Sequence, residues 1–184
     1  MTRALLLASA VLLATAAAAP AADPAQCAAA PLPDCVQAKR ATLRMDTVKH
    51  RLEWKWVAGK VVDLSDLGNP AVGVAGFDLC LYDAGGALLL SAGVGPGGTC
   101  SGQACWRARW NGFRYQDKLG QSFGITKIKL KAALGGNAKL AVSGRGDLLA
   151  RPAELPAPPV TAQLVRNDDP AVCWTSTIAK VKGR

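Results

Sequence analysis

Apolar and polar side chains alternate along several short stretches of the chain, which is the pattern of β-strands with one buried face. In residues 51–56, two tryptophans share one face and charged side chains share the other. Residues 105–110 alternate in the same way, which predicts that Trp106 and Trp110 both point inward. Residues 126–131 place three lysines on one side. Further strands are predicted at 42–46, 72–82, 87–92, 138–143, 160–166 and 172–178.

The segments between these stretches are rich in Gly, Asn, Asp and Pro. Residues 83–86 and 135–137 supply glycine, Asp and Asn, residues that accept positive φ, which suits hairpin turns. Residues 152–159 hold four prolines and cannot form a central strand. No stretch beyond residue 21 predicts a helix of three turns. About nine short strands with regular turns predict an all-β fold, an antiparallel β-sandwich or a jelly-roll-like barrel.

The start of the chain has the pattern of a secretory signal peptide. Arg3 gives a positive start, an uncharged run rich in Leu and Ala follows, and Ala19-Pro20-Ala21 supplies an A-x-A site. An uncleaved anchor helix is the alternative, but the uncharged run of 16 residues is short for a span of about 20. No later segment is long enough to span a bilayer. The predicted organisation is a signal peptide over 1–21, an Ala/Pro-rich arm over 22–38 and a β-sandwich domain over 39–184.

Composition narrows the class of protein. The chain has 184 residues, of which 50% are apolar and 19% charged, and this excludes a disordered chain. The formal net charge is +9, and removal of the leader with its single Arg leaves +8. His50 is the single histidine, so a metal cage of several histidines is excluded. The sequence predicts no cofactor and no metal.

The cysteines predict disulfides and an oxidising compartment, so we expect a secreted or periplasmic protein. All six lie beyond the leader: Cys27, Cys35, Cys80, Cys100, Cys105 and Cys173. Metal binding is the alternative, but no CxxC pair is present. Six cysteines allow 15 connectivities, and the sequence does not select one. The spacing favours local bridges Cys27–Cys35 and Cys100–Cys105, with Cys80–Cys173 joining distant strands.

Clusters of aromatic, cysteine and glycine residues follow one another in a set order. They include Trp54-Lys55-Trp56, Leu79-Cys80-Leu81-Tyr82-Asp83, Gly97-Gly98-Thr99-Cys100, Cys105-Trp106, Gly112-Phe113-Arg114-Tyr115-Gln116-Asp117, Gly124-Ile125-Thr126, Lys129-Leu130-Lys131, Gly144-Arg145-Gly146, Gln163-Leu164 and Cys173-Trp174. Together, over roughly residues 40–184, they resemble an all-β, Cys/Trp-bearing module found in uncharacterised secreted bacterial proteins. The resemblance implies export, a β-fold and structural cysteines. It implies no activity and no site residues.

The residues that could carry catalysis have simpler interpretations. His50 lies between two basic residues at the start of a strand, which indicates a solvated turn. No Gly-x-Ser-x-Gly motif is present, and Glu53 and Glu154 have no evident carboxylate partner. Three further groups are interpreted as turn residues. The first is Asp63, Asp66 and Asn69, for which calcium binding is the alternative. The others are Asp168-Asp169 and Arg145-Gly146-Asp147, the second of which has the sequence of the integrin-binding tripeptide. The five tryptophans are interpreted as core residues, with sugar or base stacking as the alternative.

Cations are concentrated on the polar side of three predicted strands. These residues are Arg51, Lys55, Arg107, Arg109, Lys127, Lys129 and Lys131. If the three strands share a sheet, the side chains form a positive stripe that favours polyanions such as acidic polysaccharide, lipopolysaccharide or extracellular DNA. The alternative is a solvated face that keeps the protein soluble.

Two functions follow as hypotheses. The first is a non-catalytic structural or binding module outside the cytoplasm, which binds polyanions through its basic sheet face. The second is an enzyme acting on envelope carbohydrate polymers. Two acids brought into one pocket by folding would favour the enzyme, and scattered acids would favour the module.

The leader generates the first testable prediction. We expect the exported protein to begin at Ala22, with cleavage after Ala18 as the alternative, because Ala19-Pro20-Ala21 gives the peptidase small side chains at its site. N-terminal sequencing of the exported protein measures this directly. Intact Met1 in a membrane fraction contradicts it.

Overall fold

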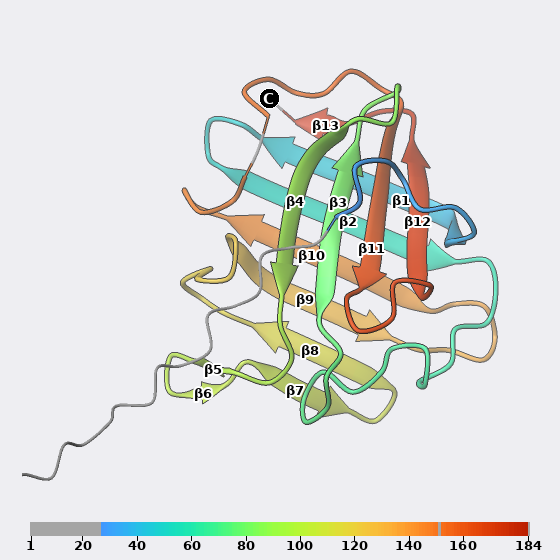
Figure 1. The fold of residues 1–184 in the computed structure, drawn as a ribbon, viewed down its shortest axis with the longest axis vertical. Helices are drawn as coiled ribbons and strands as arrows, with labels where there is room; N and C mark the ends of the chain where they lie inside the picture. Colours follow the sequence, from blue (N-terminus) through green and yellow to red (C-terminus); the bar gives the residue numbers. More distant parts are fainter. Residues whose placement is uncertain (1–26, 151, 184) are drawn as a thin grey trace, which may run out of the picture.

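The computed structural model describes residues 27–150 and 152–183, so the predicted signal peptide and its cleavage site lie outside the described residues. These residues form an all-β fold, as predicted from the alternation, and no α-helix occurs among them (Figure 1). In particular, this part of the chain has no helix long and apolar enough to cross a membrane.

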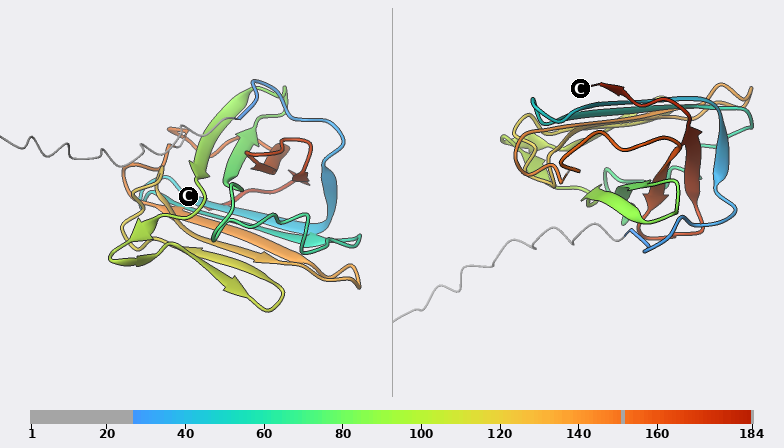
Figure 2. Two further views of the ribbon diagram at one scale, coloured as in Figure 1. Left: turned by 60° about the horizontal axis from the view of Figure 1, so that its bottom comes forward. Right: turned by 90° about the horizontal axis from the view of Figure 1, so that it is seen from above.

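The strands form two layers that cross one another (Figures 1 and 2). The strands pair in one continuous order, β4-β3-β11-β12-β1-β2-β10-β9-β8-β7, with β13 beside β1. We call the layer β4-β3-β11-β12 the smaller sheet and the layer from β1 to β7 in this order the larger sheet. A separate hairpin consists of β5 and β6. The bounds are β1 (Val36–Asp46), β2 (Arg51–Ala58), β3 (Phe77–Tyr82), β4 (Leu88–Val94), β5 (Thr99–Cys100), β6 (Gln103–Ala104), β7 (Trp106–Arg109), β8 (Gly112–Gln116), β9 (Ile125–Lys131), β10 (Lys139–Arg145), β11 (Val160–Arg166), β12 (Cys173–Ile178) and β13 (Lys182–Gly183).

Strand β1 belongs to both layers. Its first residues, Val36 and Gln37, pair in parallel with β12 of the smaller sheet. The register shifts between Ala38 and Arg40, and the rest of the strand pairs with β2 of the larger sheet. Such an irregularity bends a strand and lets it change sheets at a corner. Because β1 pairs in parallel with β12 and with β13, the sheets of this sandwich-like fold are mixed rather than purely antiparallel.

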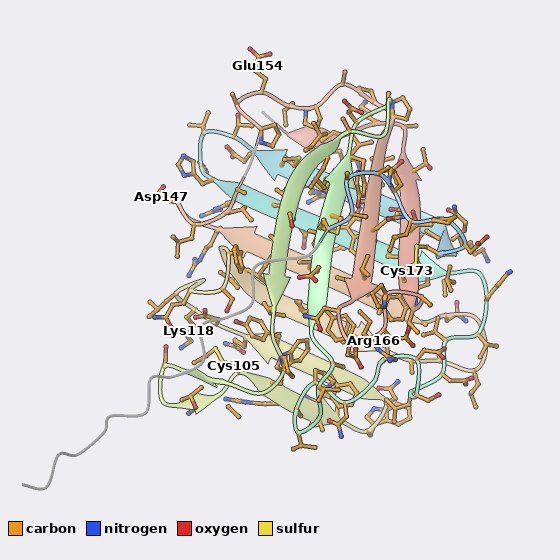
Figure 3. The ribbon with its side chains drawn as sticks, in the orientation of Figure 1. Cys105, Lys118, Asp147, Glu154, Arg166 and Cys173 are labelled. Atoms are coloured by element: carbon orange, nitrogen blue, oxygen red, sulfur yellow. A yellow bond between two sulfur atoms is a disulfide. The ribbon has the colours of Figure 1, made fainter. Side chains whose placement is uncertain are left out.

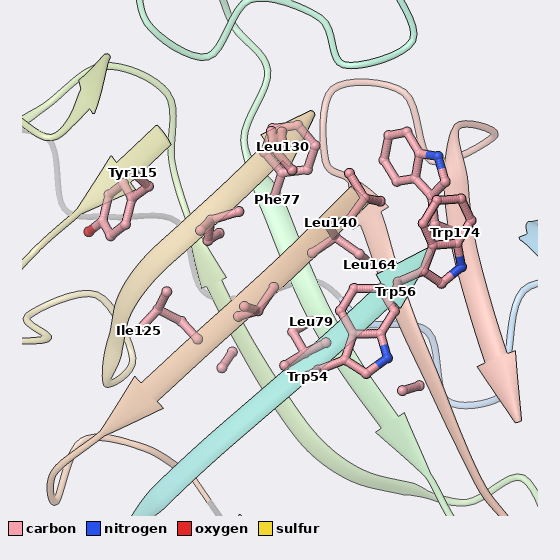
Figure 4. Close-up of a cluster of buried hydrophobic side chains, with 14 of the residues drawn as sticks. Trp54, Trp56, Phe77, Leu79, Tyr115, Ile125, Leu130, Leu140, Leu164 and Trp174 are labelled. Carbon is pink, nitrogen blue, oxygen red and sulfur yellow. The ribbon is translucent and has the colours of Figure 1, made fainter. Parts of the chain in front are cut away.

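The core lies between the layers and is built around the two tryptophans of β2 (Figure 4). Trp54 and Trp56 are completely buried. The indole Nε1 of Trp54 donates to Oγ of Ser176 at 3.0 Å, and that of Trp56 donates to the carbonyl of Thr175 at 3.0 Å. Each indole thereby satisfies its polar atom and ties the larger sheet to β12 of the smaller sheet.

Two expectations about the strands were wrong. The strand predicted at 72–82 begins only at Phe77, because the backbone amides of Val72 and Gly73 bond to Asn69 and hold this segment in a turn. Trp110 does not point inward and is 89% exposed. Strand β7 ends at Arg109 and the chain reverses, so the alternation that predicted an inward Trp110 stops one residue before it.

The disulfides confirm three bridges but correct two of the predicted pairings. Cys100–Cys105 is formed as predicted. Cys27 pairs with Cys80, and Cys35 pairs with Cys173, so the predicted bridges Cys27–Cys35 and Cys80–Cys173 were wrong. Every cysteine is paired, which indicates an oxidising compartment.

The correct pairing follows from the path of residues 27–35. This segment covers the outer side of the smaller sheet, where Cys35, Cys80, Tyr82, Val165 and Cys173 form a second apolar cluster with Leu32 packed against it. The side chain of Gln163, 1% exposed, accepts from the amide of Leu32 at 2.9 Å and donates to its carbonyl at 2.8 Å. The two cysteines of the segment therefore reach β3 and β12 rather than each other.

The bridges differ in the loops that they close, and this predicts different contributions to stability. Cys35–Cys173 spans 138 residues and Cys100–Cys105 spans 5. Chain entropy then predicts a loss of about 5 kcal/mol for the Cys35→Ser/Cys173→Ser double variant and about 2 kcal/mol for Cys100→Ser/Cys105→Ser. Urea unfolding followed by circular dichroism measures both free energies of unfolding. Equal losses would contradict the dominance of the long bridge.

Candidate functional site

The larger sheet has one face against the core and one face that no other element of the described chain covers (Figure 2). The registers of β2, β10, β9, β8 and β7 place all seven cations predicted from the sequence on this uncovered face. One row across the sheet contains Lys55, Lys129 and Arg107, and the next contains Lys131 and Arg109. Binding of a ligand by these residues stays a prediction.

Five further cations on β1, β8 and β10 share the same face: Arg40, Arg44, Arg114, Lys139 and Arg145. Sequence reasoning missed Arg114 because no strand was predicted at 112–116. It missed the others although Arg44 and Lys139 lie in predicted strands, where the same alternation places them outward. We call these twelve residues the basic face.

The formal charge of the basic face accounts for the whole net charge of the protein. Its strands contribute only two acids to this side, Asp46 and Glu53, so its formal charge is +10. The whole sequence has a net charge of +9, and the remainder therefore sums to −1. Glu53 forms an ion pair with Lys55, with Nζ and Oε1 2.8 Å apart. The positive potential is thus focused on one surface rather than spread over the molecule.

Cations of the basic face stand directly opposite one another on neighbouring strands. The directly opposed pairs are Arg107 with Arg114, Arg114 with Lys129, Lys131 with Lys139, and Arg51 with Arg145. Like charges in such positions destabilise a sheet by about 0.2–1 kcal/mol a pair. The arrangement therefore costs stability in the free protein.

Arg114 lies at the centre of this arrangement, between Arg107 and Lys129. Its Nη2 donates to the side-chain oxygen of Gln116 at 2.9 Å. Its Nε is buried and has no hydrogen-bond partner. An unsatisfied charged donor of this kind is costly, and an anion beside the guanidinium would reduce that cost.

The other residues considered from the sequence lie away from the basic face or in turns. His50 lies in the β1–β2 turn, and its Nδ1 is 2.7 Å from Asp147, whose side chain is 93% exposed. The amide of Asp63 donates to the carboxylate of Asp66 at 2.8 Å, as expected for a turn. The guanidinium of Arg166 pairs with Asp168 and Asp169 in the turn before β12.

Acidic side chains are scattered over the described residues. Asp147 and Glu154 lie at separate places on the long connection between β10 and β11, at the rim of the molecule (Figure 3). No group of three or more His, Cys, Asp or Glu side chains with the geometry of a metal site occurs in residues 27–150 and 152–183. Burial raises the pKa of the Tyr82 and Tyr115 phenols, so both stay neutral and pack in the interior.

Comparison with known proteins gives no family assignment: no protein-family model, no curated protein and no solved structure matches the chain. The resemblance to a secreted bacterial module stays a prediction.

The opposed cations predict that removing one of them stabilises the free protein. Lys129→Gln, which relieves the contact with Arg114, is expected to raise Tm at low salt by about 1–2 °C. Lys127→Gln is the matched control, because Lys127 faces Ser143 and Gln116 and has no cation directly opposite. Both variants lose one charge on the same strand and face.

Scanning calorimetry at low salt and at about 1 M NaCl measures the effect. The difference between the variants should vanish at high salt, where the screening length falls to about 3 Å. Equal melting temperatures at low salt would show that the opposed cations do not repel one another measurably.

Proposed function

We propose that the chain is exported and acts outside the cytoplasm as a non-catalytic module that binds polyanions through the basic face. The single observation that carries this proposal is the set of directly opposed cations on an uncovered sheet. A polyanion that bridges these rows neutralises their repulsion and releases its own counterions.

A face that serves solubility alone is the competing interpretation. Such a face does not need cations beside cations, since interspersed charges of both signs keep a surface soluble without the cost of repulsion. The basic face has twelve cations and two acids, while the rest of the sequence is close to neutral. This segregation favours a ligand of opposite charge.

Export is supported by two independent features. The first residues of the sequence have a positive start, an apolar run and an A-x-A site. The cysteines are joined in three bridges, which persist in oxidising compartments. In a secreted or periplasmic setting, the polyanions within reach are acidic polysaccharide, lipopolysaccharide and extracellular DNA.

The proposal predicts retention on a heparin column at about 50 mM NaCl and elution as the salt rises, because released counterions drive binding. The triple variant Lys127→Gln/Lys129→Gln/Lys131→Gln should elute at clearly lower salt. When the binding constant K of this variant is measured at several salt concentrations, the slope of log K against log salt should be less steep than that of the wild-type protein by about 2–3.

The matched control is Lys49→Gln/Lys60→Gln/Lys180→Gln, which removes the same charge from exposed positions outside the basic face. It should elute close to the wild-type protein. Circular dichroism verifies that each variant is folded. Passage of the wild-type protein through the column at low salt, or equal weakening by both triple variants, would overturn the proposal.

A further inference from the structure

An open groove with a cavity volume of about 520 Å³ lies where the basic face meets the ends of its strands. Three segments line it: residues 62–64 after β2, residues 110–111 between β7 and β8, and residues 131–134 at the end of β9. Lys131 belongs both to this lining and to the basic face. A ligand bound along the face can therefore continue into the groove.

Backbone contacts hold the three segments together. The carbonyl of Asn111 accepts from the amide of Ala132 at 2.9 Å, and its side-chain Nδ2 donates to the carbonyl of Ala132 at 3.2 Å. The amide of Ala133 donates to the carbonyl of Val62 at 3.1 Å. The turn that carries Trp110 is thereby fixed against the end of β9, and the groove is formed before any ligand arrives.

Gly112 allows this close approach of the turn to β9. A Cβ at this position would lie 1.9 Å from the carbonyl oxygen of Leu130, so only glycine fits without a shift of the backbone. Beside it, the side chain of Trp110 is 89% exposed, whereas the other four tryptophans are at most 2% exposed. An exposed indole on a fixed turn, with little contact of its own, offers a flat apolar surface to a ligand.

Resting on the proposed function, we propose that this groove is a glycan subsite, in which Trp110 stacks against a pyranose ring of an acidic polysaccharide while Lys131 and its neighbours bind the acid groups. The C–H bonds on one side of a pyranose match the apolar indole and the side chains of Leu64 and Leu134. Asp63 and Asn111, also in the lining, offer oxygens that accept hydrogen bonds from sugar hydroxyls.

One feature favours a sugar over a nucleic-acid base. Proteins that bind single-stranded nucleic acid stack successive bases on several aromatic side chains, and Trp110 is the single large exposed aromatic among the described residues. The lining also contains Asp63, Asn111 and Lys131, and an acyl chain would leave these polar side chains without hydrogen-bond partners from the ligand.

The test compares polyanions with and without sugar rings. Polygalacturonate and heparin carry their charge on pyranose rings, and inorganic polyphosphate has no ring. We expect Trp110→Ala to weaken binding of at least one of the two glycans about tenfold and to change polyphosphate binding less than twofold. Leu119→Ala is the matched control, because Leu119 is 69% exposed and lies in the β8–β9 loop at the other end of β8.

Tryptophan fluorescence gives a second measurement. Adding the bound glycan to the wild-type protein should shift or quench the emission of Trp110, and this change should be lost in Trp110→Ala, since the remaining tryptophans are buried. Circular dichroism verifies that the variant is folded.

The outcomes separate the two proposals. A wild-type protein that binds polyphosphate but neither glycan, or a Trp110→Ala variant that binds both glycans normally, overturns the glycan subsite and leaves the basic face as a polyanion site. Selective weakening of single-stranded DNA binding by Trp110→Ala also overturns it, in favour of a nucleic acid. A wild-type protein that binds none of these polyanions overturns the proposed function itself.

Discussion

Burial of Trp54 and Trp56 between the two layers is the constraint on which the rest of the structure depends. Side chains alternate along a strand, so a slip of one residue would move both indoles to solvent and bring the charged residues of β2 into the core. The hydrogen bonds from the indoles to Ser176 and Thr175 fix the position of the tryptophans further. Because β10, β9, β8 and β7 pair in register outward from β2, this one placement decides which side chains of the whole sheet face solvent.

The basic face could be predicted in part from the sequence for the same reason. Its strands alternate cleanly, so Lys55, Lys127 and Lys129 were assigned to the polar side without knowledge of the strand order. The order of the strands in the sheet brings together segments that are far apart in the sequence, such as β2 and β10. Alternation within a strand carries no information on its neighbours, so the opposed pairs became visible only in the fold.

Other features depend on contacts that local patterns do not encode. Strand β3 of the smaller sheet is buried on both sides, since the core covers one and residues 27–35 cover the other, and β3 has no exposed residue. Because such a strand has no polar face, the sequence does not indicate to which side each residue points. The pairing of Cys80 with Cys27 of the N-terminal segment could therefore not be predicted. Trp110 was misplaced because alternation predicts direction only inside a strand, and it lies just beyond the end of β7.

The disulfides and the basic face are connected through stability. The four opposed cation pairs together cost about 1–4 kcal/mol. Closing the long loop between Cys35 and Cys173 contributes about 5 kcal/mol, a gain similar in size and opposite in sign. This bridge joins the N-terminal segment and β1 to the smaller sheet, away from the basic face, so it stabilises the fold and leaves that face uncovered. An oxidising compartment thus lets the sheet tolerate a concentration of positive charge that repels itself.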